Sequence, residues 1–201
     1  MLYRNNLTAS RYSYFQSNMN IPDWLRSARE HWQWRGNTRP PFAAPPGPGQ
    51  VSVWGFPRPP RLAPDAREVV IRWNDLEVAR TRRAVLVLET AHPPSFYLPW
   101  DDVARHLLQP AAGQSFCEWK GPARYWSLVH AHERLPNVAW SYPQPLQGAE
   151  ALANCVAFYP RDLDCSVDGA RVLPQPGGFY GGWITPELVG PFKGEPGSEG
   201  W

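Results

Sequence analysis

The side chains best suited to acid–base chemistry lie in residues 88–103, with the sequence LETAHPPSFYLPWDDV. Glu89 follows an apolar run and is expected at a strand end, with Thr90 and His92 on the next loop. A carboxylate beside an imidazole can serve as a general acid or base, or form half of a metal site. Two prolines stiffen this loop, which then presents Tyr97. In the structural alternative, Glu89 and Thr90 bond loop amides and His92 lies at the surface.

A second candidate region spans residues 115–126, SFCEWKGPARYW. Strand alternation predicts that Cys117 and Trp119 face one way, and that Glu118 and Lys120 face the other. A lysine close to a cysteine can lower the pKa of the thiol, and a lysine with a nearby tyrosine can bind an anionic group. In the alternative, Cys117 is a small core residue and Glu118 forms a surface pair with Lys120.

The aromatic and glycine-rich run of residues 174–185, PQPGGFYGGWIT, is the third candidate. Its glycines allow tight turns or a close approach of the backbone to a ligand. It is not a phosphate loop, because it has neither GK[ST] nor GxGxxG. Phe179, Tyr180 and Trp183 therefore either anchor a packed turn or wall a pocket.

We predict no metal site and no cofactor. His130 and His132 stand two residues apart near the end of an expected hairpin, but no third ligand is evident beyond the adjacent Glu133. No Ser/His/Asp order and no GxSxG element is present.

The composition indicates one soluble globular domain rather than a disordered chain. Hydrophobic residues make up 43% and charged residues 19% of the 201 residues. The 24 prolines divide the chain into short elements and disfavour a helical fold. Because the net charge is only +2 and the basic residues are scattered, nucleic-acid binding is not expected.

The location is predicted to be cytoplasmic, with no membrane partner. No apolar stretch approaches the length of a spanning helix, and the start of the chain, MLYRNNLTASRYSYF, lacks the apolar core of a signal peptide. Cys117, Cys155 and Cys165 form an odd set without CxxC spacing, which is typical of reduced and buried thiols.

Short strands and turns must position these residues. We expect a hairpin of 68–73 and 76–81 around Asn74–Asp75, a second turn at Asp168–Gly169, and a buried strand over 84–88. An amphipathic helix is predicted over Trp100–Leu108. Further strands are expected at the following positions: 96–98, 116–119, 124–130, 137–142, 155–159, 164–167 and 171–173.

The N-terminal part is predicted to be a separate extension. Asn20 is expected to cap a short helix with Pro22 in its first turn and an end near Gly36. Residues 39–50, RPPFAAPPGPGQ, are typical of an extended linker. We therefore predict an arm with a short helix and a proline-rich linker over 1–50, and a β-rich domain over 51–201.

Several longer segments, in this order, carry a resemblance to a known family over about residues 51–201. The segments are SVWGFPRPP (52–60), LETAHPPSFYLPWDDV (88–103), SFCEWKGPARYW (115–126), AWSYP (139–143), VAFYP (156–160), VDGAR (167–171) and PQPGGFYGGWIT (174–185). Together they closely resemble the family catalogued as domain of unknown function 427. The resemblance implies a β-tent-like fold, with small antiparallel sheets packed at an angle and few helices.

The resemblance also bears on metal and reaction chemistry. The β-tent group includes relatives that bind zinc through two CxxC pairs, which this chain lacks, so we expect no structural zinc. The family also carries a nucleotidyltransferase label, a chemistry that uses a Gly-Ser turn followed by paired acids. Asp162 and Asp164 are separated by one residue, but no Gly-Ser turn precedes them at a useful spacing.

We therefore predict an all-β, β-tent-like fold with a short helical N-terminal extension, whose family segments converge on one concave site. Glu89 is predicted to act as the acid or base, and Lys120 to bind an anionic group of the substrate. Tyr97 is counted with them as a catalytic residue. The expected ligand-binding residues are Thr90, Cys117, Trp119, Tyr125, Trp140 and Tyr159.

Three classes of function fit these residues. The preferred prediction is binding of an unknown small molecule, planar or sugar-like, in an aromatic-walled pocket. The alternatives are an enzyme with Glu/Lys acid–base or nucleotidyl-transfer chemistry, and an interaction module that docks a protein partner through exposed aromatics. The oligomeric state stays open.

Overall fold

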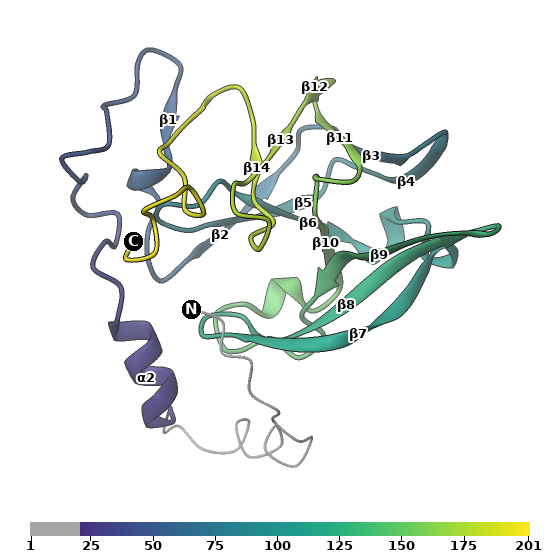
Figure 1. The fold of residues 1–201 in the computed structure, drawn as a ribbon, viewed down its shortest axis with the longest axis horizontal. Helices are drawn as coiled ribbons and strands as arrows, with labels where there is room; N and C mark the ends of the chain where they lie inside the picture. The colour runs from purple at the N-terminus through teal and green to yellow at the C-terminus, as the bar shows by residue number, and fades with distance from the viewer. Residues whose placement is uncertain (1–20) are drawn as a thin grey trace.

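A computed structural model describes residues 21–201 of the chain (Figure 1). These residues form small sheets, almost all antiparallel, and one short α-helix near the N-terminus, which confirms the predicted all-β class. Figure 1 shows the sheet that contains β3 (Val69–Trp73) and β4 (Leu76–Thr81) above the ribbon of β7, β8 and β9 (within residues 108–141), with the helix α2 (Asp23–Glu30) set apart at the other end.

The largest sheet in the described part has seven strands in the order β2-β5-β6-β10-β9-β8-β7. Its inner strand β10 is buried along its whole length, because CVAF is apolar at every position and both faces are covered. The predicted strand over 84–88 is confirmed as β5. The bounds are β2 (Arg61–Asp65), β5 (Ala84–Leu88), β6 (Ser95–Pro99), β7 (Leu108–Cys117), β8 (Gly121–His130), β9 (Glu133–Ser141) and β10 (Cys155–Phe158).

A four-stranded sheet in the order β12-β11-β3-β4 packs beside it. Alternate residues Val69, Ile71 and Trp73 of β3 are buried, as strand periodicity requires for a sheet with one covered face. Both predicted turns are confirmed. Asn74 takes a positive φ in the first turn, and Asp168 and Gly169 do so in the second. The bounds are β3 (Val69–Trp73), β4 (Leu76–Thr81), β11 (Asp164–Val167) and β12 (Ala170–Arg171).

The predicted helix over Trp100–Leu108 is wrong. The segment contains two 3₁₀ turns, Trp100–Asp102 and Arg105–Leu107, and Leu108 already begins β7. Val103 between them is extended and forms a β-bridge with Ala79, so strand pairing overrides the helical periodicity. The apolar residues 103, 107 and 108 are nevertheless buried, as the pattern required.

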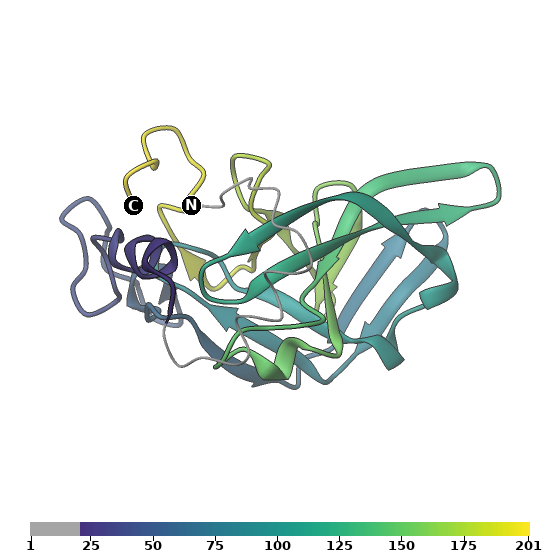
Figure 2. The ribbon, with the colours of Figure 1, turned by 90° about the horizontal axis from the view of Figure 1, so that it is seen from below.

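The β7–β9 ribbon is longer than predicted. The expected strands over 116–119, 124–130 and 137–142 are present, but each begins earlier, and β8 and β9 turn tightly at Ala131–His132. Ala131 takes a positive φ of 52°, which lets the hairpin close over two residues. Figure 2 shows this hairpin projecting from one end of the molecule.

The helix α2 (Asp23–Glu30) ends well before the predicted Gly36. Arg35 returns to donate hydrogen bonds to the carbonyls of Arg29 and Glu30, which satisfies the open helix end. The predicted cap Asn20 lies outside the described residues. No helix in the part that the structure describes is long and apolar enough to cross a membrane.

Residues 39–50 lack helix and strand, but they pack on the C-terminal end of the chain. The ring of Phe42 stacks on Trp201 with centroids 5.0 Å apart, and Trp201 packs edge-on against Trp54 at 5.2 Å. Both views show this linker beside the C-terminal segment (Figures 1 and 2). The short strands here are β1 (Val51–Ser52), β13 (Leu173–Pro174), β14 (Trp183–Ile184) and β15 (Leu188–Val189).

Candidate active or binding site

A cavity of about 100 Å³ lies among β5, β6, β7, β8 and β9, the loop after β5 and the loop before β14. We call it the aromatic cavity, because rings form much of its wall. Seven of the nine predicted site residues line it: Glu89, Tyr97, Cys117, Lys120, Tyr125, Trp140 and Tyr159. The structure therefore brings together side chains that are up to 70 positions apart, while their functional role stays a prediction.

Two predicted site residues do not line this cavity. Thr90 is fully buried, and its hydroxyl donates a hydrogen bond to the carbonyl of Phe56, which fits its alternative role of bonding the loop backbone. Trp119 lines a neighbouring cavity instead.

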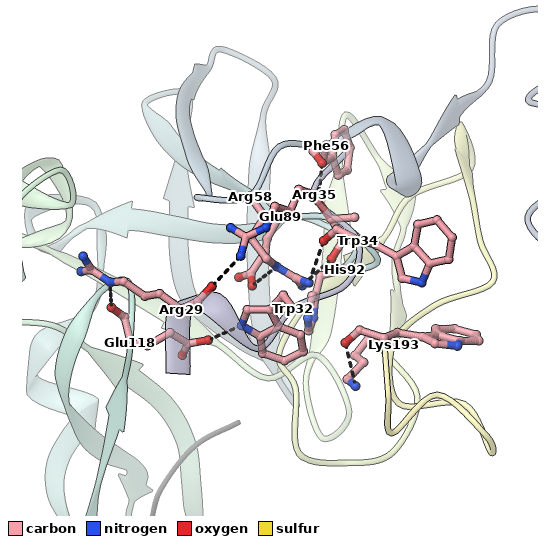
Figure 3. A network of polar contacts seen from close by, with 12 residues as sticks. Arg29, Trp32, Trp34, Arg35, Phe56, Arg58, Glu89, His92, Glu118 and Lys193 are labelled. Atoms are coloured by element: carbon pink, nitrogen blue, oxygen red, sulfur yellow. Dashed lines mark hydrogen bonds and ion pairs between the residues drawn. The ribbon is translucent and has the colours of Figure 1, made fainter. Parts of the chain in front are cut away.

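Glu89, which Figure 3 shows beside Arg58, carries the negative charge next to Lys120 in the aromatic cavity. One carboxylate oxygen, Oε1, accepts a hydrogen bond from Arg58 Nε at 3.2 Å, and the other, Oε2, lies 3.7 Å from Lys120 Nζ. The side chain of Arg58 is 0% exposed, and those of Glu89 and Lys120 are 12% and 13% exposed. Because charges this poorly solvated are costly without partners, the three side chains hold each other in place.

These partners fix the charges of the pair. Burial alone would raise the pKa of Glu89, but the positive charges around it, that of Lys120 foremost, lower it below its ordinary value. Desolvation would lower the pKa of Lys120, but the acidic groups Cys117 and Glu89 raise it. At neutral pH the cavity therefore contains a carboxylate and an ammonium.

Arg58 also joins the N-terminal arm to the site. Its guanidinium donates hydrogen bonds to the carbonyls of Trp34 and Thr90, at 3.2 Å and 2.8 Å. It lies over the ring of Trp32, 4.1 Å from the centroid, in a cation–π contact. Trp32 in turn lines the aromatic cavity, so a residue from outside the β-rich domain completes its wall.

The predicted strand alternation over residues 117–120 is wrong, and so is the surface pair of Glu118 and Lys120 in its alternative. Strand β7 ends at Cys117, so residues 118–120 form a turn and no longer alternate. Glu118 is buried and accepts a hydrogen bond from Trp32 Nε1 at 2.9 Å, while the Cys117 thiol donates to its other oxygen at 3.7 Å. Burial raises the pKa of Cys117 despite the nearby Lys120, so this cysteine is a neutral thiol at neutral pH.

His92 lies in the wall of the aromatic cavity. The structural alternative, which placed it at the surface, is therefore wrong for this residue. The Oε1 of Gln175 accepts a hydrogen bond from the Gly182 N–H, so Nε2 of this amide is the donor. It donates to the Lys193 carbonyl and to Nδ1 of His92, at 2.8 Å and 2.9 Å. Since Nδ1 accepts, the neutral imidazole carries its proton on Nε2.

The ionisation of His92 agrees with this geometry. Burial lowers the pKa of His92 to about 4, although Glu89 acts in the opposite direction. The imidazole and the Tyr180 ring pack at a steep angle of 73°, with ring centroids 4.8 Å apart. His92 therefore offers a fixed N–H donor in place of a titrating base.

Aromatic rings complete the wall. Trp140 Nε1 donates to the hydroxyl oxygen of Tyr97 at 2.9 Å, and the Trp140 ring lies 4.4 Å from that of Tyr159. Tyr125 shares a hydrogen bond of 2.7 Å with Ser115. The backbone of Gly181 touches the Trp140 ring so closely that an added Cβ would lie 2.1 Å from it. The rings are thus held in fixed positions by bonds and packing.

Sequence reasoning missed several lining residues. Glu118 was not among the expected site residues, and the alternative placed it at the surface, although it belongs to the candidate segment 115–126. Tyr180 belongs to the glycine-rich run. Trp32 gave no signal, because a tryptophan near a short helix is ordinarily a packing residue. The further lining residues are Val87, Pro93, Ser95, Ala123, Tyr142, Gln175, Phe179 and Gly181.

No cluster of three or more His, Cys, Asp or Glu suited to a metal ion occurs among residues 21–201. Asp162 and Asp164, the paired acids considered for nucleotidyl transfer, are exposed and form surface ion pairs with Arg161 and Arg171. Neither lines the aromatic cavity. The three cysteines are buried and free.

Comparison with known families gives one match. A family model described as "Domain of unknown function (DUF427)", with a short name that refers to nucleotidyl transfer, matches residues 61–169. No curated protein matches the chain. The matched range contains the Glu89–Lys120 pair and most of the ring wall, whereas Trp32, Arg58 and Gln175 lie outside it.

Proposed function

Because this chain belongs to the family described as domain of unknown function 427, a description that assigns no reaction, we propose a function from its own site: binding of a small, ring-bearing polar molecule. The aromatic cavity supplies flat walls for the ring. The Glu89–Lys120 pair and His92 supply the acceptor and donors for polar oxygens of the ligand.

One observation carries the proposal. The Lys120 ammonium has three N–H donors, yet among the described residues it donates no hydrogen bond, and its only ion pair is with Glu89, at 3.7 Å. A poorly solvated ammonium with open donors favours a ligand oxygen beside it. The adjoining rings then favour a molecule that stacks on Trp140 and Tyr159.

The ionisation pattern favours binding over acid–base catalysis. A general acid or base works best with a pKa near the operating pH. In this cavity the pKa of His92 falls to about 4 and that of Glu89 is lowered, while those of Lys120 and Cys117 are raised. These four groups therefore keep fixed protonation states around neutrality, as a binding site requires.

The test is a thermal-shift screen of the purified chain against sugars, nucleosides, aromatic acids and acyl compounds. A ligand present at about 100 times its dissociation constant adds roughly 2.7 kcal/mol of stability. We expect a shift with at least one ring-bearing compound, and no shift with the same compound in a Glu89→Gln/Lys120→Ala variant.

A matched control comes from an exposed pair on β4. Glu77 and Arg80 form a similar ion pair at 2.7 Å, far more exposed to solvent. The Glu77→Gln/Arg80→Ala variant should keep the full ligand shift. If the compound found in the screen raises the unfolding temperature of the Glu89→Gln/Lys120→Ala variant as much as that of the wild type, the binding site lies elsewhere and the proposal fails.

A further inference from the structure

A second cavity, of about 180 Å³, shares Lys120 and Val87 with the aromatic cavity. We call it the basic cavity, because Arg29 and Lys120 both line it. The remaining lining residues are Pro59, Pro60, Leu62, Val87, Trp119, Gln147, Gly148 and Ala149. No acidic side chain is among these described lining residues, whereas the aromatic cavity is lined by both Glu89 and Glu118.

Arg29 reaches this cavity from helix α2. Its Nε donates a hydrogen bond to the backbone carbonyl of Glu118 at 2.8 Å, and its guanidinium lies over the Trp119 ring, 5.1 Å from the centroid. These contacts hold the guanidinium plane against the cavity wall. Within residues 21–201, Arg29 forms no ion pair, although the Glu118 charge acts on it from further away, so its other N–H donors can take a further acceptor.

Trp119 supplies the independent observation. Its indole Nε1 is buried, and among the described residues it is the one buried side-chain nitrogen or oxygen atom without a hydrogen-bond partner. Buried polar groups in folded proteins are almost always bonded, because an unmet donor costs about 1–3 kcal/mol. Because Trp119 also lines the basic cavity, its unmet donor favours an acceptor close to this cavity that the protein itself does not provide.

We propose that the basic cavity binds a small oxyanion, with Arg29, Lys120 and the Trp119 N–H as its recognition groups. Two cations and one neutral donor match the acceptor oxygens of a phosphate, sulfate or carboxylate group. Glu118, the residue before Trp119, points its carboxylate to Trp32 and lines the aromatic cavity instead. Glu150 is exposed and accepts a hydrogen bond from the Gly148 N–H at 2.9 Å, outside the lining. The volume is large enough for a group bigger than a water molecule.

This site is distinct from the proposed function and stands without it. Lys120 belongs to both cavities, so its substitution cannot separate them. Arg29 and Trp119 line the basic cavity alone, and they are the residues on which the test depends.

The experiment is isothermal titration calorimetry of the full chain at low ionic strength, with inorganic phosphate and with acetate as probes. We expect saturable binding of at least one anion, weakened by added sodium chloride. Arg29→Gln should weaken it about tenfold or more, since a charged hydrogen bond is lost, and Trp119→Phe several-fold. Preference for phosphate or for acetate identifies a tetrahedral or a planar oxyanion, and either outcome supports the site.

Arg26 offers the matched control, because it lies on the same helix with its side chain 58% exposed. Arg26→Gln should change the affinity less than twofold, and Arg29→Lys, which keeps the charge, should retain most of it. Thermal unfolding of each variant verifies that it is folded. Absence of saturable heat with both anions, or equal losses in Arg26→Gln and Arg29→Gln, would overturn the proposal.

Discussion

The aromatic cavity and the basic cavity use the same lysine for different chemistry. On the side of the aromatic cavity, Lys120 faces Glu89, and the rings and His92 surround the pair. In the basic cavity the same side chain is joined by Arg29 and an unmet indole N–H. The carboxylates are confined to one cavity, so the difference between the two lies in the neighbours of Lys120 and not in Lys120 itself.

The two cavities also differ in where their residues come from. The aromatic cavity is built mainly from the range that matches the family model, residues 61–169. The basic cavity takes Arg29, Pro59 and Pro60 from the segment before that range. This comparison indicates that the family core supplies the ring-walled site, and that the N-terminal arm adds the second cation.

The largest effect is expected from Arg58, which holds the Glu89 carboxylate of the aromatic cavity. Its side chain is fully buried and holds Glu89, two backbone carbonyls and the Trp32 ring. Arg58→Ala leaves the Glu89 carboxylate short of a partner and should destabilise the protein by about 3–5 kcal/mol. Urea unfolding of the variant and the wild type measures this difference.

An exposed arginine serves as the reference for Arg58. Arg72 forms an ion pair of 3.5 Å with Glu77, and its side chain is 47% exposed. Arg72→Ala should leave the unfolding midpoint nearly unchanged, because exposed pairs contribute little. Equal destabilisation by the two variants would contradict the central position given to Arg58.

The next largest effect on stability is expected from Gly181→Ala, which alters the aromatic cavity sterically. An added Cβ at Gly181 would lie 2.1 Å from the Trp140 ring, so Gly181→Ala must displace a wall of the aromatic cavity. Overpacking of this severity should cost about 2–3 kcal/mol. Gly55→Ala is the control, since no atom lies within 4 Å of its added Cβ.

Binding assays on Gly181→Ala then sharpen the comparison. The variant should lose the ligand of the aromatic cavity while it binds phosphate as the wild type does. Loss of both would mean that the two cavities behave as a single site.

The smallest effect concerns pH and belongs to His92. The pKa of His92 is about 4 in the folded chain and about 6.5 when unfolded, so between these values the unfolded chain binds more protons. Stability should therefore fall as the pH drops, by at most about 2 kcal/mol between pH 7 and pH 5. Glu89, whose pKa is lowered, adds its own loss only below its ordinary value of 4.5.

Urea unfolding across this pH range, with His92→Gln beside the wild type, isolates the contribution. The variant should show a flatter dependence of stability on pH from 7 to 5. An unchanged slope would show that His92 titrates normally, against the tautomer fixed by Gln175.

Much of this arrangement could be predicted from local patterns. Alternation in EVVIRW and the turn residues Asn74–Asp75 and Asp168–Gly169 specify two hairpins correctly, because the backbone conformations they need are set by the residues themselves. The segment around Val103 could not be predicted, since its bridge to Ala79 is a tertiary contact that outweighs a helical pattern.

The candidate site was likewise predictable only where local sequence patterns determine it. Glu89, Tyr97 and Lys120 were found from their residue types and segments, and the fold brings them to one cavity. Trp32 and Arg29 were missed because their role depends on where helix α2 docks, which no periodicity encodes. Glu118 was misplaced because strand β7 ends one residue before it.

The most direct test of the account is a crystal structure of the chain bound to the strongest hit of the thermal-shift screen. We predict the ring of the ligand against Trp140 and Tyr159, with an oxygen within hydrogen-bond distance of Lys120 Nζ. A ligand bound outside the aromatic cavity, without contact to Glu89 or Lys120, would contradict the proposed function.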